Sequence, residues 1–69
     1  MRYMLETSKQ DGLVLEIIYQ AENGNLSQRK IKVKSYNESH FIAYCFERKK
    51  TRMFRLDRLL SIAPLNKVQ

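Results

Sequence analysis

The chain has 69 residues, a formal net charge of +6 and 43% hydrophobic residues. A chain this short buries only about 60% of the surface that it exposes when unfolded, so we expect one small domain over residues 1–69. Cys45 is the single cysteine and His40 the single histidine, which excludes an internal disulfide and leaves no cysteine–histidine cluster for zinc. No apolar stretch has the length of a signal peptide or a membrane span, so we expect a cytoplasmic protein without membrane contact.

The positive charge is concentrated in one part of the sequence. Residues 28–58 include ten Lys or Arg and three Asp or Glu, a local charge of +7, whereas the rest of the chain has a charge of −1. A surplus confined to one segment favours an anionic partner, and the structural alternative is a solvated basic face.

One helix and five short strands are predicted in chain order. Residues 2–11 contain no proline or glycine and precede Gly12, a suitable C-cap, which predicts a short helix. Its apolar residues Tyr3, Met4 and Leu5, with Met1, are expected to cover one end of the β-structure. Alternating apolar residues and turn residues then predict strands over 13–20, 26–35, 40–47, 51–56 and 61–65, with a helical turn over 57–60.

The alternation also predicts which side chains share a face of the sheet. The second strand places Arg29 beside Ile31 and Val33, and the fourth strand places Arg52 on the side of Phe54. An arginine in register with core residues is costly unless its charge is paired or reaches the rim. The position of Arg52 therefore suggests a functional role, with its charge either paired or at the rim.

Five short strands joined by short turns predict a mainly β fold. At this length, a small, strongly bent and partly open barrel of five strands, with the short N-terminal helix beside it, would remove most exposed strand edges.

The third and fourth strands resemble those of a known family. The residues that carry the resemblance are Ala43-Tyr44-Cys45, Arg48 and Arg52-x-Phe54-Arg55-Leu56-Asp57-Arg58-Leu59, preceded by Tyr19, Gly24, Ser27-x-Arg29 and Ile31. Over residues 13–60 the chain resembles the WYL domain. The resemblance implies an Sm-like small barrel that serves as the ligand-sensing part of bacterial transcription regulators and binds nucleic acid or nucleotide-like ligands through a basic surface. Family members usually carry a helix-turn-helix domain, whereas this chain is expected to be a stand-alone copy.

The sequence departs from the family at the motif that gives the family its name. Ser39, His40 and Phe41 stand at the Trp-Tyr-Leu positions, and Val33 stands where the family often has a proline. His40 keeps a ring that can hydrogen-bond and stack, but its charge changes near neutral pH. We therefore expect a ligand that differs from that of the relatives or binds less tightly.

Six residues are predicted to bind the anionic ligand: Arg29, His40, Arg48, Arg52, Arg55 and Arg58. Arg52, Arg55 and Arg58 recur at intervals of three, which could bring at least two guanidinium groups together as a clamp for phosphate or carboxylate. The alternative for each arginine is a structural ion pair, with Asp57 or Glu47 as the nearby acids. For Arg58, an ion pair with Asp57 and a contact with the ligand are equally weighted.

Aromatic residues near these arginines could stack on a ligand, and Tyr36, in its turn, is the first candidate. The features together predict a non-catalytic regulatory module that binds single-stranded nucleic acid or a nucleotide. The sequence has no paired carboxylates and no glycine-rich phosphate loop, so we expect no enzymatic activity, metal or cofactor. The alternative is a module that binds an acidic protein partner or forms a homo-oligomer.

Overall fold

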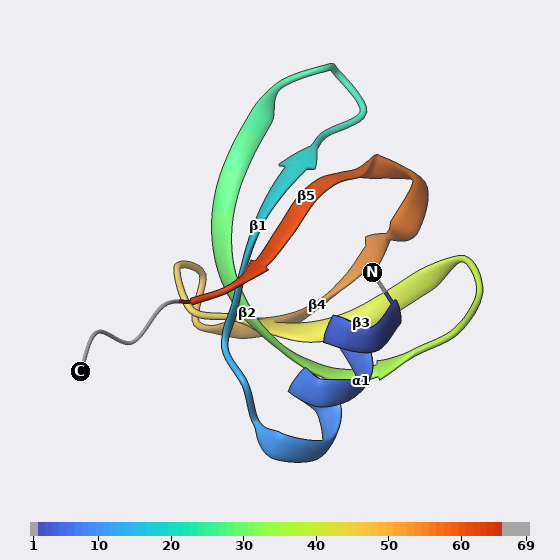
Figure 1. The fold of residues 1–69 in the computed structure, drawn as a ribbon. Helices are drawn as coiled ribbons and strands as arrows, with labels where there is room; N and C mark the ends of the chain where they lie inside the picture. The colour runs from blue at the N-terminus through green and yellow to red at the C-terminus, as the bar shows by residue number, and fades with distance from the viewer. Residues whose placement is uncertain (1, 66–69) are drawn as a thin grey trace.

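The computed structural model describes residues 2–65, in which one helix is followed by five strands. Figure 1 shows their arrangement. The elements are α1 (Arg2–Asp11), β1 (Leu15–Gln20), β2 (Leu26–Tyr36), β3 (His40–Cys45), β4 (Lys50–Arg55), the 3₁₀ turn η1 (Leu56–Arg58) and β5 (Leu59–Pro64). The strands form one antiparallel sheet in the order β4-β3-β2-β1-β5. The prediction of a mainly β fold with a short N-terminal helix is confirmed. In residues 2–65, no helix is both long and apolar enough to cross a membrane.

The sheet is strongly curved but is not closed (Figure 1). β4 and β5 are its two edges, so neither the predicted barrel nor its Sm-like form is confirmed. The sheet stays open because η1 carries the chain from the end of β4 to the opposite edge of the sheet. There Leu59 pairs with Tyr19 and Ile62 pairs with Ile17, so β5 extends the sheet beside β1 and does not join β4.

Backbone conformation explains where several elements end. Gly12 has a φ of 73° and its N–H donates to the carbonyl of Ser8 at 2.9 Å, which confirms the predicted C-cap of α1. Gly24, with a φ of 92°, lies in the predicted turn between β1 and β2. Lys49 has a φ of 57° and its N–H donates to the carbonyl of Cys45 at 2.7 Å. The β3–β4 turn therefore begins directly after Cys45, and β3 ends two residues before its predicted end.

Other boundaries also differ from the prediction. β1 begins at Leu15, two residues late, because the Leu13 carbonyl accepts a hydrogen bond from the Ser8 hydroxyl and lies outside the ladder. Tyr36 pairs with Phe41 and so belongs to β2, although it was predicted in the following turn. η1 occupies residues 56–58 in place of 57–60, and β5 correspondingly begins at 59.

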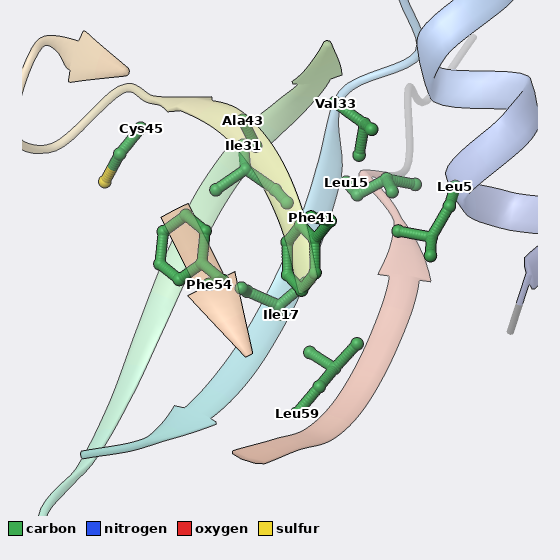
Figure 2. Packing of buried hydrophobic residues seen from close by; sticks show 10 residues of the cluster. All are labelled: Leu5, Leu15, Ile17, Ile31, Val33, Phe41, Ala43, Cys45, Phe54 and Leu59. Atoms are coloured by element: carbon green, nitrogen blue, oxygen red, sulfur yellow. The ribbon is translucent and has the colours of Figure 1, made fainter. Parts of the chain in front are cut away.

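The hydrophobic core lies on the inward face of the sheet and follows the predicted alternation. Figure 2 shows its buried members: Leu5, Leu15, Ile17, Ile31, Val33, Phe41, Ala43, Cys45, Phe54 and Leu59. The rings of Phe41 and Phe54 stack with their centroids 5.1 Å apart. Cys45 lies at the end of the cluster away from α1 (Figure 2). The apolar core therefore ends near Phe54 and Cys45, where charged residues begin.

Helix α1 packs on the sheet through one narrow face. Leu5 and Ser8, three residues apart, are buried, whereas Tyr3 is 79% exposed. The predicted covering role is confirmed for Leu5 and is wrong for Tyr3, because the helical period turns Tyr3 away from the core; Met1 lies outside the described residues. The Ser8 hydroxyl accepts a hydrogen bond from the Val33 N–H at 2.8 Å while it donates to Leu13. Ser8 thus joins the helix to β2 at a buried position.

Candidate anion-binding site

A hollow of about 330 Å³ opens beside the β1–β2 turn. It is lined by Tyr19, Ala21, Glu22, Arg29, Arg52, Met53, Phe54, Arg55 and Arg58. Four of the six predicted site residues meet here, from β2, β4 and η1. We call this concavity the arginine hollow.

Strand register brings two of these arginines to the end of the core. Arg29 pairs with the buried Ile17, and Arg52 pairs with the buried Ala43, so both share the inward face of the sheet. Each is half-buried. The predicted placement of Arg52 on the side of Phe54 is confirmed.

Arg29 forms the inner wall of the arginine hollow. Its Nε donates to the Oγ of Ser27 at 3.1 Å, and its Nη1 lies 3.6 Å from the Sγ of Cys45. The guanidinium carbon lies 5.9 Å from the centroid of the Phe54 ring, within the range of a cation–π contact. Neutral groups therefore hold Arg29 in place, so its charge is not cancelled by these contacts.

Arg55 is held by a neighbouring acid. Its Nε donates to Oδ1 of Asp57 at 3.0 Å and its Nη2 donates to Oδ2 at 2.6 Å. These hydrogen bonds lower the pKa of Asp57 and raise that of Arg55. The ion pair that the sequence offered to Arg58 is thus made by Arg55, because the chain turns from β4 into η1 between residues 55 and 57.

Arg52 and Arg58 line the arginine hollow, and the charge of Arg58 also contributes to the lowered pKa of Asp57. Within residues 2–65, neither makes a salt bridge, and both are half-buried. A half-buried guanidinium that lacks a carboxylate can use its fork of N–H donors for an incoming anion.

The other two predicted site residues lie elsewhere. Arg48 is exposed in the turn at residues 46–49 and does not line the hollow. The nearby acid Glu47 accepts hydrogen bonds from the backbone N–H of Lys30 at 3.0 and 3.3 Å. Burial opposes ionisation of Glu47, but the backbone hydrogen bonds, the charge of Lys30 and the contact with Cys45 together lower its pKa. Glu47 therefore binds the backbone of β2 and forms no salt bridge with an arginine within residues 2–65.

His40 begins β3 and lines a separate, more apolar hollow of about 280 Å³. Its Nδ1 lies 2.8 Å from the Oγ of Ser39, and its backbone N–H donates to Asn37. His40 pairs in register with Arg55, and Met53 lines both hollows. The structure therefore places His40 next to the arginine hollow but not in it.

Tyr36 also lines the hollow of His40, although its hydroxyl is already engaged. It donates to the carboxylate of Glu6, which lowers the pKa of Glu6 and raises that of Tyr36. Stacking of Tyr36 on a ligand stays a prediction. The aromatic side chains that do line the arginine hollow are Tyr19 and Phe54, and neither was predicted to contact a ligand. For Phe54, the signal in the sequence was the alternation that placed it on the side of Arg52.

Residues 4–64 match the family model described as WYL domain. Among solved structures, the chain is similar to proteasome accessory factor B/C (PafBC) of Arthrobacter aurescens, with 24% sequence identity and a TM-score of 0.77. The similarity covers 96% of this chain but only 11% of that chain, and at this identity it shows the fold alone. A search of curated proteins found no match.

Proposed function

Because the chain belongs to the WYL domain family, whose members are regulatory ligand-binding modules, we propose that it binds an anionic ligand in the arginine hollow. The observation that carries the proposal is the meeting of four guanidinium groups from three separate elements in one concavity. Glu22 is the acid among the lining residues, so the charge of the lining is strongly positive. Such a hollow attracts anions, and its geometry suits oxygen-rich groups.

The ligand that we propose is single-stranded nucleic acid or a nucleotide. Binding sites for single strands combine guanidinium groups with aromatic surfaces, and here Tyr19 and Phe54 lie among the arginines. Arg52 and Arg58 supply the free donors, while Arg29 is held in position by Ser27. Transcription-related regulation in a bacterial cytoplasm is the setting that the family suggests, and it belongs to the proposal.

We also propose that the module is not an enzyme. The reactive side chains His40 and Cys45 lie at opposite ends of β3. Cys45 is buried in the core, whereas His40 lines its separate, more apolar hollow. Within residues 2–65, no three His, Cys, Asp or Glu side chains are grouped to hold a metal ion.

Titration with a short fluorescent oligothymidylate over a series of salt concentrations tests the proposal. Affinity should fall steeply as salt rises, because phosphate contacts release counterions. Arg52→Ala should weaken binding about tenfold and reduce the salt slope by about one.

Lys34→Ala is the matched control, because Lys34 is exposed on β2 and lines a different hollow, beside α1. It removes the same charge and should change affinity much less. Absence of binding at low salt, or equal losses for the two variants, would contradict the proposal.

An acidic protein partner is the second candidate. β4 is an edge of the sheet, and its Met53 is 63% exposed between Arg52 and Arg55. An extended acidic peptide could add to this edge and place an apolar side chain against Met53. A protein complex that survives nuclease treatment and is lost in Met53→Asp would favour this candidate. Sedimentation of the pure chain as a monomer would dismiss a homo-oligomer.

A further inference from the structure

We propose that Asp57 is an internal competitor for the anion site, a carboxylate that occupies Arg55 until an incoming phosphate displaces it. The inference rests on the proposed function and adds to it a residue that sets the affinity of the same site. A carboxylate in this position lowers the affinity of the site for every anion. The loss is smallest for anions such as phosphate groups, which can replace both hydrogen bonds between Asp57 and Arg55.

The geometry of the pair supports displacement. Nε and Nη2 of Arg55 each donate to one oxygen of Asp57, at 3.0 and 2.6 Å. Phosphate uses the same two-pronged contact with arginine, so Asp57 holds the donors that a phosphate in the hollow would take. Arg55 lines the hollow, while Asp57 does not.

The exposure of the pair indicates that displacement is easy. The side chains of Arg55 and Asp57 are 50% and 63% exposed. Ion pairs this accessible to water are weak, and they shift an equilibrium by about two- to fivefold. Arg52 and Arg58 form no salt bridge within the described residues, so an anion can engage them first and then compete for Arg55.

Asp57 is the acid that hydrogen-bonds to Arg55 in the described part of the chain, whereas the charge of Glu22 acts on Arg55 without a salt bridge. Glu22 lines the hollow but makes no salt bridge within the described part of the chain. Glu38 is exposed in the β2–β3 turn and lies outside the hollow. Glu38 therefore offers a matched substitution that changes the net charge without touching Arg55.

The experiment compares the full chain with Asp57→Asn and Glu38→Gln, using the fluorescent oligothymidylate as probe and inorganic pyrophosphate as competitor. Both variants gain one unit of positive charge. Asp57→Asn should tighten binding about two- to fivefold beyond Glu38→Gln. Asp57→Ser removes the same charge with a smaller side chain and should tighten binding equally. It replaces Asp57→Asn in the comparison if that variant folds poorly.

A second background shows whether Asp57 acts through Arg55. When Arg55→Gln is already present, adding Asp57→Asn should tighten binding no more than adding Glu38→Gln does. Equal effects of Asp57→Asn and Glu38→Gln in the natural background would overturn the inference, as would weaker binding of Asp57→Asn. If Asp57→Asn binds and the natural chain does not, the competitor role is supported and the proposed function fails. If neither binds, both fail.

Discussion

The hydroxyl of Tyr19 accepts a hydrogen bond of 2.9 Å from the backbone N–H of Arg55, although two strands separate β1 from β4 in the sheet. The Tyr19 ring also packs edge-on against Phe54, with centroids 5.1 Å apart. One side chain thus holds the bend of the sheet beside the arginine hollow, whose wall it also forms.

Tyr19→Phe should lower the free energy of unfolding by about 0.5–1.5 kcal/mol, because the Arg55 N–H loses its partner while the ring contact with Phe54 remains. Urea denaturation measures the change. Tyr44→Phe is the control, since the Tyr44 ring packs against Phe46 and its hydroxyl makes no hydrogen bond within residues 2–65. Equal stability of the two variants would show that the hydrogen bond does not support the bend.

Ser8→Ala should cost about 1–3 kcal/mol of stability, because the Val33 N–H and the Leu13 carbonyl lose a buried partner. Thr7→Ala removes a hydroxyl from the neighbouring residue and serves as the control. The Thr7 hydroxyl donates to the Tyr3 carbonyl at an exposed position, so its loss should cost less than about 0.5 kcal/mol of stability. Denaturation midpoints that coincide would contradict a structural role for Ser8.

The hydrogen bond between Tyr36 and Glu6 should make stability depend on pH at both extremes. The pKa of Glu6 is lowered from 4.5, so its contribution is present above that value and is lost as the pH falls through the folded pKa. The pKa of Tyr36 is raised from 10.0, so its contribution is present below that value and is lost as the pH rises through the folded pKa.

Thermal unfolding of the natural chain and of Tyr36→Phe across this pH range measures the effect. The natural chain should unfold at the higher temperature near neutral pH, and the difference should shrink at both ends of the range. A difference that does not change with pH would mean that the variant acts through packing.

Arg58→Ala should weaken binding of the oligothymidylate about tenfold, because Arg58 lines the hollow without a salt bridge in the described part of the chain. Arg48→Ala should weaken it less than about twofold, since Arg48 is exposed in a turn outside the hollow. Fluorescence anisotropy at constant salt compares the two. A larger loss for Arg48→Ala would move the site to the β3–β4 turn.

Local patterns predicted the elements well because local physics decides them. The Gly12 cap, the turn at Gly24 and the alternation of apolar residues depend on backbone conformation and on the two faces of a strand. Boundaries were missed where a distant partner intervenes. β1 starts late because the Ser8 hydroxyl takes the Leu13 carbonyl, and Tyr36 continues β2 because Phe41 lies opposite.

The candidate site was predictable in part for the same reason. The spacing of Arg52, Arg55 and Arg58 indicated a cluster, and all three line one hollow. Arg48 is nearer to Arg52 in sequence than Arg29 is, yet Arg29 is the one that joins the cluster. Strand register controls this outcome, because β2 and β4 both flank β3 and bring Arg29 and Arg52 to the same end of the core.

The sequence by itself determined which residues are apolar, which face of each strand they occupy, and that the chain carries a surplus of arginine suited to an anion. The tertiary structure alone decided that the sheet stays open, that Arg48 lies outside the hollow, and that Asp57 forms its salt bridge with Arg55 and not with Arg58. The physical reason is that alternation and charge belong to single residues. Edge pairing and ion pairing depend on how η1 and the bend of the sheet place distant groups within a few ångströms of each other.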